Sequence, residues 1–134
     1  MRYLLDANIC IYTMKRHPPE VRSRLRGLPM GDVGISSIVL AELQYGIHKS
    51  RRRQQNEAAL TDFLAFCLVL DWPHQAAAVY GELRAKLERQ GQVIGGNDLL
   101  IAAHALHVGA TLVTNNTQEF ARVPRLKVEN WINA

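Results

Sequence analysis

The sequence predicts an α/β fold in which a central parallel β-sheet is covered by helices on both faces. Short apolar runs, typical of buried strands, alternate along the chain with longer segments whose apolar residues recur at helical spacing. Parallel strands require such helical crossovers, and the helices bury both faces of the sheet. We predict a single domain over residues 1–134, because this length is sufficient for one hydrophobic core.

The first half of the chain is predicted to alternate strands with short helices. Residues 2–12, RYLLDANICIY, indicate a buried strand that ends at Asp6 and the start of a helix. Residues 19–26 form a short helix, because Pro19 lies at its start and Gly27 just past its end. The other expected elements are a strand at 33–36, helices at 38–50 and 54–65, and a strand at 67–71.

The second half begins with the longest predicted helix. Pro73 opens this helix, which runs to about Gln90 and is closed by Gly91. Asp98 begins a further helix that Gly109 ends. Strands are expected at 111–114 and, at the sheet edge, at 127–129.

Composition limits the classes of function. Sixteen Lys and Arg against 12 Asp and Glu give a net charge of +4, which is compatible with a nucleic-acid partner without establishing one. No apolar run approaches the ~18 residues of a transmembrane helix, and the N-terminus is not typical of a signal peptide. We therefore expect a cytoplasmic protein with no membrane partner. Cys10 and Cys67 lie in apolar contexts and are expected to be buried free thiols rather than a disulfide.

Three acidic residues stand where a ligand site is expected. Ligands of open parallel sheets bind beyond the carboxyl ends of the strands, and Asp6 ends the first strand. Glu42 and Asp98 each lie among apolar helical neighbours, where an unpartnered carboxylate is costly to desolvate. These acids are the candidate catalytic residues.

Each acid also has a structural interpretation. Asp6 and Asp98 could cap the helices that follow them, with Asn8 and Asn97 competing for those positions. Glu42 could form a surface ion pair with Lys49, which would contribute little to stability. The convergence of all three at one end of a sheet favours a functional site over three unrelated structural roles.

Oxygen donors of this kind suit hard divalent cations such as Mg²⁺ or Mn²⁺. Such an ion lowers the pKa of a bound water and offsets negative charge on a phosphoryl oxygen. The sequence therefore favours metal-dependent hydrolysis over nucleophilic catalysis, for which no Ser-His-Asp or Cys-His arrangement is evident.

Four stretches together carry a family resemblance over essentially the whole chain: LLDANICIY, ISSIVLAELQYGIHKS, GGNDLLIAAHA and LVTNNTQEF. The chain resembles PIN-domain ribonucleases of the VapC group, toxins of bacterial type II toxin–antitoxin systems. The resemblance implies a three-layer α/β/α domain with strand order 3-2-1-4-5 and Asp6, Glu42 and Asp98 as metal ligands. It implies Mg²⁺- or Mn²⁺-dependent cleavage of single-stranded or loop RNA, leaving a 5′-phosphate and a 3′-hydroxyl. It also implies a homodimer and a cognate VapB-type antitoxin.

One position departs from the family pattern. Many PIN domains place a fourth acid shortly after strand four, where this chain has Asn116, with Glu119 three residues later. Either Asn116 is a weak ligand, or Glu119 reaches the site through water, or a substrate phosphate completes it. Thr114 and Ser37 are candidate supporting hydroxyls, and Asn8 is a candidate for orienting Asp6.

Basic residues just past the Glu42 helix are the candidate RNA contacts: Lys49, Arg51 and Arg52. The alternative is a solvated helix end favoured by the helix dipole. Candidate aromatic side chains for base stacking are Tyr12, Tyr45, Trp72 and Trp131. The TNNTQEF form resembles the enteric branch of these toxins, which implies the anticodon loop of initiator tRNA as the substrate.

Two other classes of function remain as alternatives. An aspartyl phosphotransferase would use Asp6 as a nucleophile, but such enzymes usually carry a second acid two residues on, where this chain has Asn8. A catalytically weak PIN-fold module that binds RNA or a partner is the second alternative, and Asn116 favours it.

Overall fold

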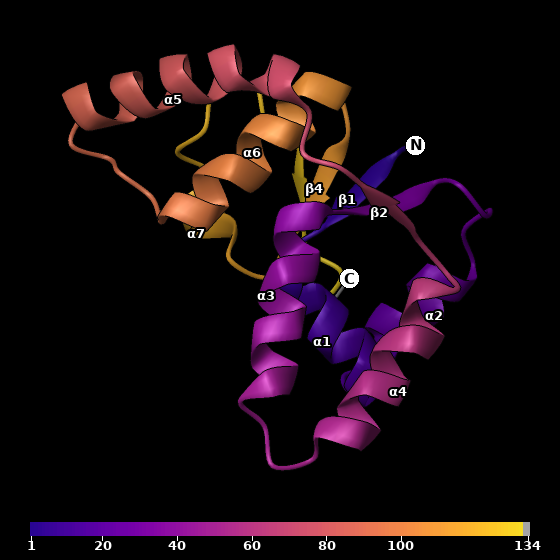
Figure 1. The fold of residues 1–134 in the computed structure, drawn as a ribbon. Helices are drawn as coiled ribbons and strands as arrows, with labels where there is room; N and C mark the ends of the chain where they lie inside the picture. Colours follow the sequence, from indigo (N-terminus) through magenta and orange to yellow (C-terminus); the bar gives the residue numbers. More distant parts are fainter. Residues whose placement is uncertain (133–134) are drawn as a thin grey trace.

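A computed structural model of the chain, in which residues 1–132 are described, contains a five-stranded parallel sheet in the order β3-β2-β1-β4-β5 (Figure 1). This confirms the predicted strand order, with β1 at the centre. The strands are short and lie close to their predicted ranges: β1 Tyr3–Leu5, β2 Val33–Ser36, β3 Leu68–Leu70, β4 Thr111–Val113 and β5 Val128–Glu129.

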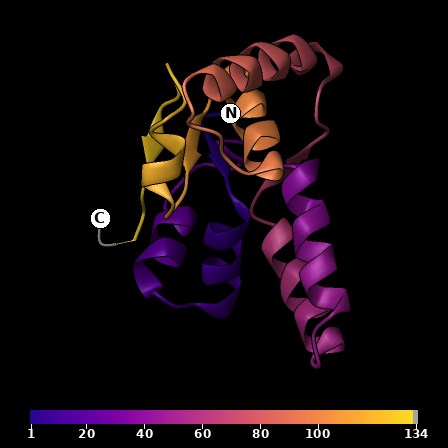
Figure 2. The same ribbon diagram turned by 90° about the vertical axis from the view of Figure 1, so that its left-hand side faces the viewer.

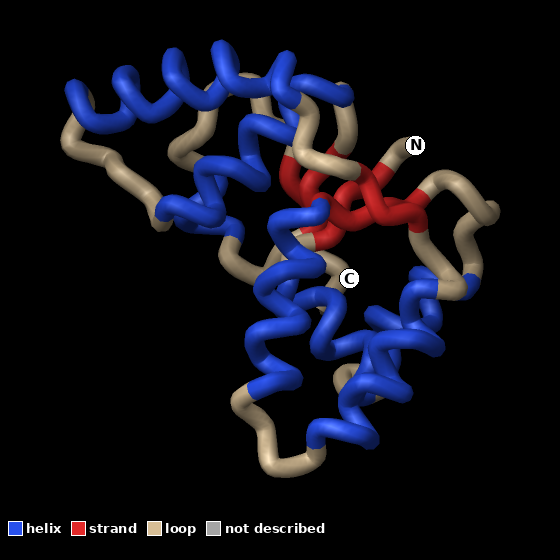
Figure 3. The backbone as a smooth tube through the Cα atoms, in the orientation of Figure 1, coloured by secondary structure: helices blue, strands red, loops and turns tan. Residues whose placement is uncertain are grey.

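The helices surround this sheet on separate sides. Helices α5 and α6 pack together at the top of Figure 1, and α1 to α4 gather below; the turned view keeps the same separation (Figure 2). Colouring by secondary structure shows the strands between these helical groups (Figure 3). The helices are α1 Ala7–Lys15, α2 Pro19–Arg26, α3 Ser37–His48, α4 Arg53–Leu64, α5 Ala77–Arg89, α6 Gly96–Val108 and α7 Thr117–Phe120.

The core lies on the central strands. Leu4 and Leu5 of β1 and Leu112 and Val113 of β4 are all fully buried. Such strands are apolar throughout because helices cover both faces of the sheet. The segment after β5 closes the core, because the Trp131 ring is buried and meets the ring of Tyr3 edge-on at 5.4 Å between centroids.

The structure differs from the sequence predictions at helix starts. Helix α6 begins at Gly96, so Asp98 lies within its first turn instead of beginning the helix. Pro73 precedes a 3₁₀ turn, His74–Ala76, before α5 begins. Gly109 ends α6 as predicted, with φ of 72°, a conformation that glycine adopts without steric cost.

Two further features bear on the sequence expectations. Cys10 and Cys67 are free thiols, as expected, but only Cys10 is fully buried. Within residues 1–132, none of the helices is both long enough and apolar enough to cross a membrane.

Truncating a central strand residue should be costly. We predict that Leu4→Ala lowers the free energy of unfolding by about 2–5 kcal/mol, because it removes buried methyl groups from a rigid sheet. Leu68→Ala on edge strand β3, where the side chain is 46% exposed, is the matched control and should cost less than about 1 kcal/mol. Urea unfolding measures both, and equal losses would contradict the assignment of β1 to the core.

Candidate active site

Asp6 is placed by the pairing of the two central strands. Leu5 of β1 pairs with Val113 of β4, so the residues that follow these strands, Asp6 and Thr114, are neighbours. Asp6 Oδ1 accepts a hydrogen bond of 3.0 Å from the backbone N–H of Ile9, and Thr114 Oγ1 donates to Asp6 Oδ2. Asp6 is therefore the N-cap of α1, as the structural interpretation held, and its second oxygen is directed towards the end of β4.

Glu42 lies on α3, which begins directly after β2. Its Oε1 is buried and has no hydrogen-bond partner. Burial, and after it the negative charge of Asp6, raises the pKa of Glu42 above its ordinary value. A buried carboxylate oxygen without a partner is unfavourable, so this atom is available to a cation or a proton.

Asp98 is held opposite Glu119 by the turn that precedes α6. Glu119 Oε1 accepts a hydrogen bond of 3.0 Å from the backbone N–H of Gly95, the N-cap of α6, and Asp98 is hydrogen-bonded to Glu119. Burial, this hydrogen bond and the charges of Glu119, Glu42 and Asp6 raise the pKa of Asp98 to about 7. Asp98 therefore retains a proton close to neutral pH, beside the Glu119 carboxyl group.

The four acids interact although they come from distant parts of the chain. Asp6 raises the pKa of Glu42, and both raise that of Asp98. Burial also raises the pKa of Asp6, against the hydrogen bonds from Thr114 and from the backbone N–H groups of Ile9 and Asn8. The structure thus brings the predicted residues Asp6, Glu42 and Asp98 to one region, together with Glu119, which the sequence offered as a possible completing acid.

The donor chemistry of this region fits a hard divalent cation, but the site is not preassembled. Among residues 1–132, no three His, Cys, Asp or Glu side chains are arranged so that they could hold an ion as they stand. The acids nevertheless raise one another's pKa, because electrostatic interactions reach over longer distances than the bonds between a metal and its ligands. Mg²⁺ commonly takes only one or two protein carboxylates, with waters and substrate phosphates as its other ligands. The unpartnered Oε1 of Glu42 supports the fit.

A chain of hydrogen bonds links the end of β4 to the acids. Thr114 Oγ1 donates to Asp6 and accepts from the backbone N–H of Asn116 at 2.9 Å. The side-chain amide of Asn116 donates to Glu119 Oε2. Asn116 thus positions Glu119, which in turn meets Asp98.

For the other two predicted supporting residues, Asn8 and Ser37, the contacts in the structure are not side-chain contacts with the acids. The exposed Asn8 acts on Asp6 through its backbone N–H. Ser37 Oγ accepts a hydrogen bond of 3.0 Å from the backbone N–H of Trp72, so it supports the segment after β3 rather than a carboxylate. The role of Gly95 was not predicted, although the Gly-Gly pair ahead of Asp98 is a signal for a close backbone approach.

The candidate RNA contacts are exposed at the far end of α3. Lys49 is the C-cap residue of α3, and Arg51 and Arg52 lie between α3 and α4. Their role stays a prediction. Among the aromatic candidates, Trp131 is buried in the core and is excluded as a stacking surface.

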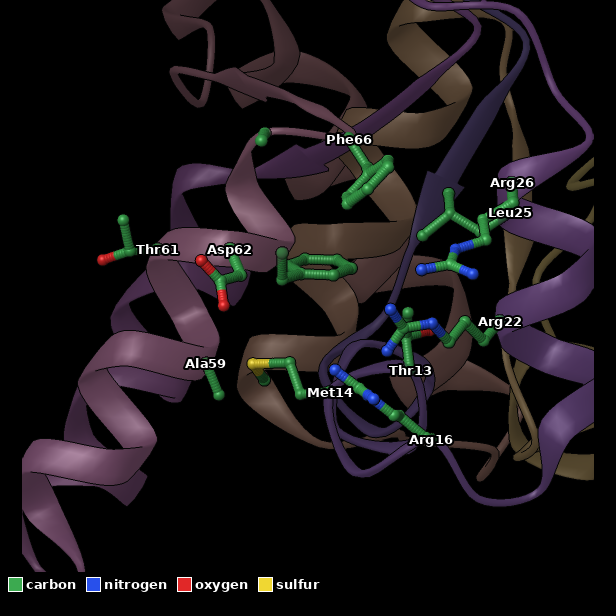
Figure 4. A pocket seen from close by; sticks show the side chains of 12 residues that line it. Thr13, Met14, Arg16, Arg22, Leu25, Arg26, Ala59, Thr61, Asp62 and Phe66 are labelled. Carbon is green, nitrogen blue, oxygen red and sulfur yellow. The ribbon is translucent and has the colours of Figure 1, made fainter.

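A separate cavity of about 540 Å³, which none of the four acids lines, opens between α1, α2 and α4 (Figure 4). Arg22 and Arg26 of α2 enter it from one side, and Phe66, just past α4, faces them from the other. Desolvation and the like charges of Arg16 and Arg26 lower the pKa of Arg22. The cavity therefore combines an apolar wall with three arginines and one acid, Asp62 of α4.

Comparison with known proteins agrees with this fold. The PIN domain family model matches residues 3–126. The chain is 49% identical over 132 residues to ribonuclease VapC2 of Rickettsia felis, covering 98% of each chain. It is 44% identical over 131 residues to the tRNA(fMet)-specific endonuclease VapC of Shigella flexneri, again covering 98% of each. The chain belongs to the PIN-domain family, in its VapC group of ribonucleases.

Solved structures show the same likeness. VapBC2 of Rickettsia felis, bound to a promoter DNA fragment, contains a chain that matches with a TM-score of 0.90 and 46% identity, covering 98% of this chain and 99% of that one. DNA-bound VapBC of Salmonella typhimurium matches with a TM-score of 0.91 and 41% identity, covering 98% of each chain.

Relieving the repulsion around Asp98 should stabilise the metal-free protein. The folded pKa of about 7 lies above the ordinary 3.8, so the folded state retains a proton that the unfolded state has lost between those pH values. The free energy of unfolding therefore falls as pH rises through this window. In chelator above pH 7, Asp98→Asn should be more stable than the native protein by on the order of 1 kcal/mol, a figure reduced for partial exposure.

Thermal unfolding in chelator across pH 4–8 measures this effect. The advantage of Asp98→Asn should shrink towards pH 4, because the unfolded state regains its proton near the ordinary pKa of 3.8. Glu82→Gln, at an exposed position on α5, is the control and should show no such pH-dependent gain. A destabilised Asp98→Asn at pH 8 would instead assign Asp98 a structural role at the start of α6.

The Thr114 hydroxyl should matter through Asp6. Thr114→Val keeps the side-chain shape but removes the donor to Asp6 and the acceptor for Asn116, so we predict a loss of about 10–100-fold in metal affinity. Thr114→Ser retains the hydroxyl and should stay close to the native affinity. Calorimetric titration with Mn²⁺ compares the two variants, and equal affinities would show that the hydroxyl does not orient Asp6.

Proposed function

We propose that this PIN-domain nuclease hydrolyses RNA phosphodiester bonds with Mg²⁺ or Mn²⁺ held by Asp6, Glu42 and Asp98. The observation that carries the proposal is the buried, unpartnered Oε1 of Glu42 beside carboxyl groups that raise one another's pKa. Crowded carboxylates of this kind are stable in their charged form only when a cation neutralises them.

The chain's own residues hold and orient the reacting groups. Thr114 and the backbone N–H of Ile9 fix the Asp6 carboxylate from two sides. The backbone N–H of Gly95 and the Asn116 amide hold Glu119, which is hydrogen-bonded to Asp98. A divalent cation bound there would supply charge stabilisation at the phosphoryl oxygen and a more acidic water. Attack by water on phosphorus and release of the 3′-oxygen would leave a 5′-phosphate and a 3′-hydroxyl.

Glu119 is the structure's best candidate for the fourth acid of the family pattern. It interacts with Asp98 directly, whereas the side-chain amide of Asn116 donates a hydrogen bond to Glu119. We therefore propose that Glu119 completes the acidic site and that Asn116 positions it.

The proposed substrate is single-stranded or loop RNA, with initiator tRNA as the first RNA to test. Relatives from Shigella flexneri and Salmonella typhimurium, 44% and 41% identical, are named tRNA(fMet)-specific endonucleases. The exposed Lys49, Arg51 and Arg52 would contact phosphates, which would make binding weaken as salt increases.

The proposed partner is a VapB-type antitoxin, because the similar solved structures from Rickettsia felis and Salmonella typhimurium are VapBC complexes. The cavity between α1, α2 and α4 would accept a segment with acidic and apolar side chains, which complement its arginines and Phe66. The homodimer implied by the family resemblance stays a prediction.

Removing a carboxylate should abolish activity without unfolding the chain. We predict that Asp6→Asn, Glu42→Gln and Asp98→Asn each lower Mn²⁺-dependent RNA cleavage by at least about 100-fold and remove toxicity on expression. Gel analysis of RNA cleavage, with circular dichroism as the folding check, measures this. Asp62→Asn, at an exposed position on α4, is the control and should retain activity.

Two outcomes would contradict the proposal. A folded Glu42→Gln protein that still cleaves RNA at the native rate would remove Glu42 from the site. A native protein that binds RNA or a partner but cleaves nothing with either metal would favour the catalytically weak binding module.

A further inference from the structure

Tyr45 on α3 is a large aromatic side chain that lies outside the hydrophobic core. It is 67% exposed, whereas Trp131 is fully buried. Trp72 is half-buried, and its indole N–H donates to the backbone carbonyl of Leu100 at 2.8 Å. Tyr12 is half-buried against the core. Of the four aromatic candidates, Tyr45 alone presents most of its ring to solvent.

The helix aligns this ring with the active site. Positions three and four residues apart share a face of an α-helix, so Glu42, Tyr45 and Lys49 form one row along α3, with Cβ atoms about 5–6 Å apart. Helical side chains lean towards the N-terminus, which directs the Tyr45 ring back towards Glu42. The adjoining face of α3, on the other side of Glu42 from Tyr45, carries the buried residues Val39, Leu43 and Ile47.

The ring already carries a cation. The Lys49 ammonium lies over the Tyr45 ring, 4.9 Å from its centroid. A single cation covers one face of a ring and leaves the other to solvent. Along this row, the Glu42 carboxylate that would hold a metal is followed by the free face of the Tyr45 ring and then by the positive charge of Lys49. Arg51 and Arg52 lie beyond the end of the row.

We propose that Tyr45 is a positioning residue that stacks a nucleobase of single-stranded RNA next to the phosphodiester bond to be cleaved, with Lys49 contacting a neighbouring phosphate. RNA fits this row because bases and phosphates alternate along its chain, and unpaired bases stack on aromatic side chains. The inference rests on the proposed nuclease function and names how its substrate is held.

The test separates binding from chemistry. Tyr45→Leu should raise KM for a loop or single-stranded RNA by about 5- to 150-fold, the range for loss of one base–aromatic stack, with a much smaller change in kcat. Tyr45→Phe and Tyr45→Trp keep an aromatic face and should stay within a few-fold of the native KM. Tyr80→Leu, on the distant helix α5, is the control and should leave KM unchanged.

A binding measurement keeps this test independent of cleavage. RNA carrying 2-aminopurine near the cleavage site is titrated with each protein in Ca²⁺, in place of the catalytic metal. Native protein and Tyr45→Phe should quench the fluorescence by stacking, and Tyr45→Leu should not. Where the native protein cleaves no RNA, the nuclease proposal fails and this titration alone decides the stacking.

Three results would overturn the inference. The first is a Tyr45→Leu variant that cleaves RNA with the same KM as the native protein. The others are fluorescence quenching that persists in Tyr45→Leu, and an absence of quenching by the native protein. Loss of a protein complex or of dimerisation in Tyr45→Leu, with RNA binding unchanged, would assign the exposed ring to a protein interface instead.

Discussion

Mutual repulsion between partly buried carboxylates is the constraint on which the rest of the site depends. Asp6, Glu42 and Asp98 all have raised pKa values, and burial is the first cause in each case. Desolvated charges of one sign are unfavourable, so the surrounding structure must hold them together. The β1–β4 pairing does this for Asp6, because it sets Thr114 beside the carboxylate. The turn before α6 holds Glu119 in place through the backbone N–H of Gly95, and Glu119 in turn holds Asp98 by a hydrogen bond.

The hydrogen bonds of the site therefore leave the charges of its carboxylates only partly balanced. Asp98 retains a proton close to neutral pH beside Glu119, and Glu42 Oε1 has no hydrogen-bond partner. This explains why no three donors are yet arranged to hold an ion in the described residues although the acids interact. A cation must displace the proton, so metal binding and proton release are one linked equilibrium.

Much of the fold followed from the sequence because strand burial and helix periodicity leave direct patterns. The strand order came from the family resemblance, since alternation alone does not fix which strands are neighbours. The three acids were identifiable because each stood at a strand end or on an apolar helix face. Helix α7 was not predicted, because its 4 residues are too few to show helical periodicity. The bond from Gly95 to Glu119 was not predicted, because it joins residues far apart in sequence.

The capping alternatives show a second limit of sequence reasoning. Asp6 both caps α1 and belongs to the acidic cluster, since a carboxylate has two oxygens and can serve both purposes. Asp98, expected to begin α6, lies in its first turn because Gly95 takes the cap position. Treating structure and function as exclusive interpretations was therefore wrong for Asp6.

The most direct measurement is the number of protons released when Mn²⁺ binds, from calorimetric titrations at pH 6 in buffers of different ionisation enthalpy. Because the pKa of Asp98 is raised to about 7, the native protein should release close to one proton per site, and Asp98→Asn much less. Binding without proton release, or no binding at all, would contradict the account of a carboxylate cluster that a cation neutralises.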